Sequence, residues 1–546
     1  MEKRQEIRPR PGLAARWTLL ALPLCYIAAA LWVRSQGGPS WLWFNLDPDY
    51  FYLLDALNIV NLTTPGHVYH PGTTVEWLGA LVLRAANPGA SADAITGAVL
   101  ADPETHLRLI GTVFIVLNAL GVLVLGAVGW RVFGDLPAAA FLQLAPFIST
   151  VVLKHSIYVK PEALLLLTVL MLAAVAVLTL QPGLLERHKG RFAAAFGVIA
   201  GFGVASKITA VPVFLLPLFV LGGVRPRILY GVWALAALIV FTLPALGAYD
   251  VFFAWMAKVS HGTSAYGGAP GATDWGVYVK GILKLFKRPA FHVVFILSGL
   301  TLIGAWWRSR QGRPAPVPEV RLLAGIWVAQ LAHVLLVAKQ PNAIYMIPSF
   351  VLIPLALVLA WRLMSGMLAD RPAAMRVLGP GLAVLLAALV AAQGYGVSKL
   401  GRQLGRDHKA ALSIDNGRFE RCARINLYAS SNPSFALMLG DYVTGSRFSE
   451  RLAVLRPAND YWLEHWWDQS RLVLRGWRGP EDITQVLNRY PCVVYRGTHW
   501  YRPPHRRILD LLMPKAVPGI KFDAICKAGK ETIATAGVDC DGRAIP

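Results

Sequence analysis

The sequence predicts a polytopic α-helical membrane protein with about eleven transmembrane helices and a small extracytoplasmic α/β domain at its C-terminus. Hydrophobic residues make up 55% of the 546 residues and charged residues only 15%, whereas about 25% of the residues of a soluble protein are charged. The apolar residues are gathered into blocks that match the thickness of a bilayer. From residue 397 onward these blocks stop and charged residues become frequent.

The apolar blocks give the predicted helices in order along the chain. Segment 17–34 is too long for the apolar part of a signal peptide and no small-residue cleavage pattern follows it, so we expect a retained helix. Segments 193–206 and 208–222 are short, and they fit either one bent helix pair or a hairpin with its tip at Ser206-Lys207. The predicted helices are 17–34, 108–128, 137–153, 162–180, 193–206, 208–222, 228–247, 290–306, 322–338, 344–361 and 377–394.

The distribution of basic residues predicts the orientation in the membrane. Residues 1–16 are strongly basic, which places the N-terminus in the cytoplasm. Alternation of the helices then places inside those loops that carry many basic residues, among them Arg187, Arg225 and Arg308, while the short loops on the other side are poor in Lys and Arg. An odd number of helices therefore places residues 397–546 outside.

Part of the net charge of +22 comes from the basic residues that set the orientation in the membrane. The basic residues are divided between the two sides of a membrane, and no basic helix interleaved with aromatic residues stands out, so we expect no nucleic-acid partner. The outer domain is itself basic. That charge suits an anionic lipid surface or an anionic glycan, or it is an ordinary solvated face.

The cysteines agree with the predicted orientation. Cys25 lies in the first helix, and the other four all lie in the C-terminal domain. An even number of cysteines in a domain outside the cytoplasm predicts disulfides, for which three pairings exist. We favour Cys422–Cys492 and Cys526–Cys540; reduced, buried cysteines are the alternative.

Two predicted outer loops are long, at 35–107 and 248–289, and long loops in compact proteins are commonly functional. In the first loop, residues 49–61 and 74–87 have the pattern of amphipathic helices, and their Trp and Tyr residues suit the membrane interface. The second loop contains the Gly-rich stretch 267–272, for which we expect a mobile segment over a cavity.

The first outer loop also contains the acidic step Asp47-Pro48-Asp49, followed by His70-Pro71. An acidic motif at the start of an interfacial helix, followed by a His-Pro or Lys-Pro step, resembles the GT-C superfamily of membrane glycosyltransferases. The likeness is greatest to its bacterial members of the protein O-mannosyltransferase and aminoarabinose-transferase types. The family's acidic pair is often Asp-Glu, so the match leaves open whether Asp47 or Asp49 is the catalytic aspartate.

The resemblance continues along residues 1–396. Ser206-Lys207 is similar to a Lys-rich step between two helices of the family, and Tyr345 with Pro348 is similar to its Arg-Tyr-x-x-Pro step. Ile344 stands where arginine is common, and we expect Lys339 to supply that charge.

The resemblance implies a glycosyltransferase in the bacterial inner or cell membrane. It implies a polyprenyl-phosphate-linked sugar as donor and an envelope glycan, lipid or protein as acceptor. The sugar moves at the outer face by an inverting displacement, in which the aspartate is the base.

A phosphate leaving group requires cations close by, and cations recur on the side of the membrane predicted to hold Asp47 and Asp49. Each also has a structural interpretation: a lysine at a helix end commonly extends to lipid headgroups, Asp49 suits a helix cap, and Glu162 suits the N-terminus of a helix dipole. The predicted substrate- and phosphate-binding residues are His70, Lys154, His155, Lys160, Glu162, Lys207, Lys339 and Tyr345.

Asp47-x-Asp49 has the form of an acidic metal motif. Lys and His can neutralise a monophosphate leaving group, so we expect neither a metal nor another cofactor.

In the C-terminal domain, 422–428 and 491–496 are predicted strands, and 434–439 and 482–489 are predicted helices. We expect this domain to recognise the acceptor or to cover the site.

The rival hypotheses are a transporter or flippase for a polyprenyl-linked glycolipid, and a structural scaffold. A transporter predicts broken helices in two matching halves, and the sequence contains no such repeat. A scaffold leaves the acidic loop and the lysines unexplained.

Overall fold

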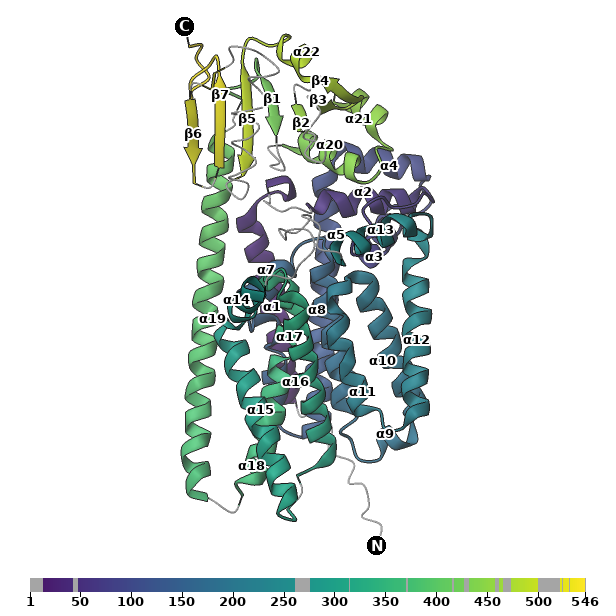
Figure 1. The fold of residues 1–546 in the computed structure, drawn as a ribbon, viewed down its shortest axis with the longest axis vertical. Coiled ribbons are helices and arrows are strands. Elements are labelled where there is room, and N and C mark those ends of the chain that lie inside the picture. The colour runs from purple at the N-terminus through teal and green to yellow at the C-terminus, as the bar shows by residue number, and fades with distance from the viewer. Residues whose placement is uncertain are drawn as a thin grey trace. The chain divides into compact units, whose positions relative to one another are not determined.

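The computed structural model describes most of the chain, and its residues form two compact units (Figure 1). We call Met1–Leu31, Val68–Trp77 and Gly111–Ser398 the membrane unit, and Trp32–His67, Leu78–Ile110 and Lys399–Pro546 the C-terminal unit. The described residues are 13–42, 48–260, 275–313, 315–369, 372–414, 417–426, 432–456, 461–464, 473–498, 521–522, 524–529 and 531–545.

Within these ranges, six helices are long and apolar enough to cross a membrane, or up to seven if one bent pair is a single span. The expected number of about eleven is therefore not confirmed. The bent pair joins Ala343–Val351 and Ile353–Met367 at 41°. The first span is Trp17–Gly37 of α1 (Leu13–Gly37), and the fourth runs from α12 (Val224–Thr242) on to Lys258. The other four are α5 (Pro103–Phe133), α8 (Pro161–Leu178), α15 (Pro289–Arg310) and α16 (Val317–Val337).

Part of the difference in number comes from segments that proline interrupts. Residues 137–153 form α6 (Leu136–Leu142), the 3₁₀ turn η2 (Ala145–Phe147) and α7 (Thr150–His155) instead of one helix. Pro146 lies in that break, and a proline removes a helix hydrogen bond and disfavours helix in the residue before it. Pro212 and Pro217 lie in the similarly short elements η3 (Ile208–Leu215) and α11 (Leu216–Val220).

The remaining predicted segments are helical but have different ends. Residues 193–206 belong to α10 (Lys189–Ser206), and 377–394 lie within the 43-residue helix α19 (Pro372–Ile414). Residues 344–361 form η6 (Ala343–Met346), α17 (Ile347–Val351) and the start of α18 (Ile353–Met367). The short helix α9 (Leu184–Arg187) precedes α10.

The two helices expected in the first long loop are present, although α2 (Asp49–Val60) is buried on nearly all sides and is not an amphipathic surface helix. The first loop forms η1 (Ser40–Leu42), α2, α3 (Thr73–Ala86) and α4 (Ala92–Ala101). In the second loop, η4 (Leu243–Ala248) and α13 (Tyr249–Ser260) precede α14 (Trp275–Phe286). The Gly-rich stretch 267–272 lies outside the described residues.

Among the described residues of the C-terminal unit, seven strands form a mixed sheet in the order β4-β3-β2-β1-β5-β7-β6. β1 runs parallel to β2 and β5, and the other pairs are antiparallel. The strands are β1 (Ala423–Asn426), β2 (Tyr461–Glu464), β3 (Val473–Gly476), β4 (Gly479–Asp482), β5 (Val493–Thr498), β6 (Ala524–Ala528) and β7 (Glu531–Ala536).

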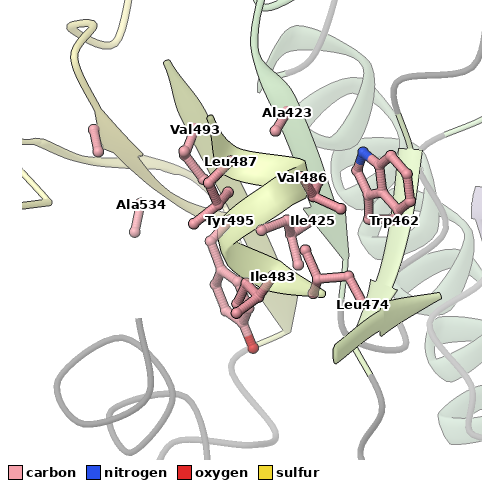
Figure 2. Close-up of a cluster of buried hydrophobic side chains, with 11 residues drawn as sticks. Ala423, Ile425, Trp462, Leu474, Ile483, Val486, Leu487, Val493, Tyr495 and Ala534 are labelled. Atoms are coloured by element: carbon pink, nitrogen blue, oxygen red, sulfur yellow. The ribbon is translucent and has the colours of Figure 1, made fainter. Parts of the chain in front are cut away.

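Three helices accompany the sheet: α20 (Pro433–Val443), α21 (Ser449–Leu455) and α22 (Ile483–Leu487). The strands and helices predicted from the sequence correspond to β1, β5, α20 and α22, so a small α/β fold is confirmed. Figure 2 shows Ile425 and Tyr495, from the parallel strands β1 and β5, together with Ile483 and Val486 of α22 in one apolar core.

Both predicted disulfides are present. Cys422–Cys492 joins the residues that precede β1 and β5, with Cα atoms 4.6 Å apart, and Cys526–Cys540 joins β6 to the turn after β7, with Cα atoms 5.5 Å apart. The alternative of four reduced cysteines is therefore wrong for this fold.

The first loop packs against α20 within the C-terminal unit. Phe51 of α2 shares a core with Phe435, Met438 and Leu439. A Cβ atom at Gly440 would lie 2.8 Å from the Leu54 side chain, so glycine permits this close packing. The contacts thus group much of the first loop with the C-terminal residues. The predicted domain division at residue 396 stays a prediction.

Candidate functional site

Lys207 lies at the junction between α10 and η3, where the helix gives way to extended backbone with φ −160° and ψ 120°. At this junction it forms an isolated antiparallel bridge with Pro71. The amide of Ile208 donates to the carbonyl of His70 at 2.8 Å. The His-Pro step and the Ser-Lys step, which the sequence separates widely, are therefore neighbours in the membrane unit.

Side chains reinforce the same junction. The Thr74 and Ser206 hydroxyls are 2.7 Å apart, and the Thr73 hydroxyl donates to the carbonyl of Ala205 at 3.4 Å. All four residues are buried. These contacts fix the start of α3 to the end of α10, so the backbone on both sides of Lys207 is held.

The Lys207 ammonium forms an ion pair with the Glu162 carboxylate. The two side chains are only 7% and 3% exposed. Glu162 is the second residue of α8, after Pro161 at its first position. Because an unpaired buried charge is costly, this pair locks the start of α8 to the α10–η3 junction.

Lys160 lies close enough to this pair for its charge to act on the Glu162 carboxylate. Lys160 is 3% exposed, and its Nζ lies 5.6 Å from the centroid of the Tyr158 ring. Lys207 Nζ lies 5.2 Å from the centroid of Tyr345, within the range of a cation–π contact. We call His155, Lys160, Glu162, Lys207 and Tyr345 the Lys207 cluster.

His155 ends α7, and its ring centroid lies 5.6 Å from that of Tyr158. Burial, together with the smaller effect of the Lys154 charge, lowers the pKa of His155 to about 3, against the opposing effect of Glu162. The imidazole is therefore neutral at physiological pH. Its Nδ1 is shielded from solvent and has no hydrogen-bond partner within the described part of the chain.

The other predicted cations differ in their surroundings. Lys154 is half-buried beside His155, and His70 is half-buried at the bridge to the Lys207 junction. Lys339 is exposed just after the end of α16.

Sequence reasoning missed a buried polar group in α16 and α17. The His333 Nδ1 and the Ser349 hydroxyl are 2.7 Å apart, and the Gln330 amide donates to the Ser349 carbonyl at 3.1 Å. The spacing of Gln330 and His333, three residues apart within an apolar helix, is the signal that could have found them.

Of the two predicted acids, Asp49 is described and belongs to the C-terminal unit. Asp47 lies outside the described residues. Asp49 is the first residue of α2 and is 2% exposed. Pro48 is the N-cap, so the interpretation of Asp49 as a capping residue is wrong, although its position still suits the helix dipole. The Arg34 guanidinium interacts electrostatically with Asp49.

Two further carboxylates of the first loop were also missed. Glu104 accepts hydrogen bonds from the Ser40 amide at 2.8 Å, the Trp41 amide at 3.2 Å and the Tyr50 hydroxyl at 2.8 Å. It thereby connects η1, the start of α2 and the start of α5.

Asp55 is fully buried in α2 and accepts from the Gly66 and His67 amides, each at 2.8 Å, and from the Asn58 side chain at 2.8 Å. Burial raises the pKa of Asp55 to about 7, and the three hydrogen bonds limit the rise. These hydrogen bonds fix the turn that follows α2.

The described residues contain no group of three or more His, Cys, Asp or Glu side chains arranged to hold a metal ion.

The described site residues therefore fall into two groups. The Lys207 cluster, His70, Lys154 and Lys339 lie in the membrane unit, and Asp49 lies in the C-terminal unit. Comparison with protein-family models and with curated proteins finds no match. Among solved structures, the chain is similar to the crystal structure of ArnT from Cupriavidus metallidurans bound to undecaprenyl phosphate, with 12% identity and a TM-score of 0.47 over 94% of this chain and 97% of that chain. Because the identity and the TM-score are low, this likeness by itself assigns no function to the chain.

Proposed function

We propose that this protein is a membrane glycosyltransferase of the GT-C type that moves a sugar from a polyprenyl-phosphate donor to an acceptor hydroxyl. The observation that carries the proposal is the Lys207 cluster, in which buried cations meet at the broken end of a helix. Ionisable residues buried among apolar helices are expensive and are functional by default.

The charges of the cluster suit a phosphate. Lys160 and Lys207 are buried, and Glu162 supplies one opposing charge. His155 is neutral. One positive charge is therefore in excess, and Lys154 adds another at the edge. A phosphate that bears a single lipid chain is the complementary ligand, and these cations stabilise the charge that develops on it as the sugar leaves.

Each predicted residue has a role in this proposal. Glu162 positions the Lys207 ammonium. The Tyr345 hydroxyl and the His155 imidazole offer hydrogen bonds. The residues that hold the phosphate are His70, Lys154, His155, Lys160, Lys207, Lys339 and Tyr345.

The reaction is an inverting displacement. The acceptor oxygen attacks the anomeric carbon of the sugar, the bond from that carbon to the phosphate oxygen breaks, and polyprenyl phosphate leaves with the bonding electrons. Asp49, or Asp47, takes the proton of the acceptor hydroxyl. Since lysines neutralise the leaving group, the step needs no metal.

The reaction takes place at the outer face of the membrane, with the N-terminus in the cytoplasm and residues 397–546 outside. The basic loops on the inner side support this orientation, and so do the two disulfides, because disulfides persist in oxidising compartments. The C-terminal unit recognises the acceptor, which is an envelope glycan, a lipid or a protein.

One observation favours the rival hypothesis of a glycolipid flippase. The span Ala343–Met367 is bent by 41° at its break, and discontinuous helices line the substrate sites of many transporters.

A reaction separates the two functions. Purified protein in nanodiscs is given polyprenyl-phosphate sugars and a crude mixture of envelope glycans, lipids and proteins, and released polyprenyl phosphate is measured by mass spectrometry. We expect release that needs the intact Lys207–Glu162 pair. In proteoliposomes, movement of a fluorescent carrier across the bilayer without release identifies a flippase and contradicts the proposal.

A further inference from the structure

Helix α14 is fixed against the end of α16. The Tyr278 hydroxyl donates to the carbonyl of Leu335 at 2.8 Å. A Cβ atom at Gly281 would lie 2.2 Å from the carbonyl oxygen of Ala338, so only glycine permits this approach. Gly281 and Leu285 are the buried residues of the helix, and with Tyr278 they mark its packing side.

The position of α14 relative to the apolar spans places it at a membrane boundary. It ends at Phe286, and α15 begins at Pro289. It also packs against the end of α16, the next span along the chain (Figure 1). The start of one span and the end of the next lie at the same face of a bilayer when a short turn joins them, so α14 lies at headgroup depth.

The two remaining sides of α14 differ in chemistry. Trp275, Val279 and Leu283 recur at every fourth residue and are 72%, 50% and 61% exposed. Residues spaced by four share one face of a helix, so these three form an exposed apolar stripe. Lys280 and Lys284, with the same spacing, form an exposed basic stripe beside it, which Lys287 extends.

We infer that α14 is a binding site for anionic phospholipids. The apolar stripe enters the acyl boundary, and Lys280, Lys284 and Lys287 bind the phosphate groups of the adjacent headgroups. A helix with an apolar side and a basic side lies in the plane of an anionic membrane surface. Near such a surface each lysine contributes roughly a fivefold gain in affinity, so the three together give about a hundredfold gain at low salt.

The test is a titration of the purified full-length protein in neutral detergent with dioleoyl phosphatidylglycerol or dioleoyl phosphatidylcholine, followed by thermal unfolding. We expect phosphatidylglycerol to raise the Tm at concentrations at which phosphatidylcholine does not. Lys280→Gln, Lys284→Gln and Lys287→Gln together should raise the half-maximal phosphatidylglycerol concentration by about a hundredfold, and each single change by roughly fivefold.

The matched control removes three exposed cations from the C-terminal unit, by Arg421→Gln, Arg478→Gln and Lys527→Gln. It should keep the wild-type response. The proposal would be overturned if both triple variants lost the phosphatidylglycerol response to the same extent. It would also be overturned if the α14 variants kept the wild-type response. A response of equal size to millimolar inorganic phosphate would also overturn it, because the site would then bind free phosphate. The single variants keep the test valid if the triple variant does not fold.

Discussion

The Lys207 ammonium is ion-paired with the Glu162 carboxylate in the interior of the membrane unit. The pair joins the second residue of α8 to the end of α10, at the point where the His70-Pro71 segment forms its bridge. The ion pair and the bridge therefore link three predicted segments that are far apart in the sequence.

Breaking this pair from one side should destabilise the protein. In Lys207→Ala the Glu162 charge is left buried without its partner, and such losses cost about 3–5 kcal/mol. We expect a clear fall in the Tm measured by intrinsic fluorescence.

The double variant Glu162→Leu with Lys207→Met removes both charges and keeps the volume. It should recover most of the Tm yet bind lipid phosphate more weakly than the wild type, because one of the proposed phosphate-binding cations is gone. A Lys207→Ala variant as stable as the wild type would show that the pair does not lock these helices.

Asp55 should make stability depend on pH. Its pKa is about 7 in the folded protein against an ordinary value of 3.8. The folded state therefore holds a proton that the unfolded state loses, so the contribution of Asp55 is complete below pH 3.8 and is lost as the pH rises to 7. Between pH 4 and pH 7, the Tm of the wild type should therefore fall relative to the Tm of Asp55→Asn. A difference that is constant, or that moves the other way, contradicts the raised pKa.

The two disulfides should differ in their effect on stability. Cys422–Cys492 closes a separation of 70 residues and Cys526–Cys540 one of 14. In the loop-entropy model their removal costs about 4 and about 3 kcal/mol, respectively. Replacing each pair by serine and comparing the Tm values tests the order. Non-reduced digests of protein from its native compartment should contain both cross-linked peptides, and alternative pairings would refute this topology.

The sequence predicted those parts of the fold that depend on composition over long windows. Segments such as 162–180 and 322–338 are mainly apolar with few charges, and both lie in long helices of the structure. Residues 137–153 are equally apolar, but Pro146 interrupts them, and hydropathy alone does not register the missing hydrogen bond.

The candidate site was predictable only as a set of residue types. Lys207 and Glu162 were identified separately, whereas their pairing depends on how α8 packs against α10. Asp55 and Glu104 were missed because their partners are mostly backbone amides and a hydroxyl that the tertiary structure brings to them. No pattern along the chain shows such contacts.

The most direct test of the central proposal is the release of polyprenyl phosphate by Asp49→Asn and Asp47→Asn. Asparagine preserves the shape of the base but cannot take up the proton, so loss of the true base should lower turnover by about 10²–10⁴-fold while lipid binding changes little. The control Asp102→Asn removes an exposed carboxylate of the same loop and should leave turnover unchanged. We predict that one of the two variants loses turnover while it remains monodisperse in gel filtration, and we favour Asp49→Asn. Near-normal turnover in both would contradict the assignment of the first loop as the catalytic loop.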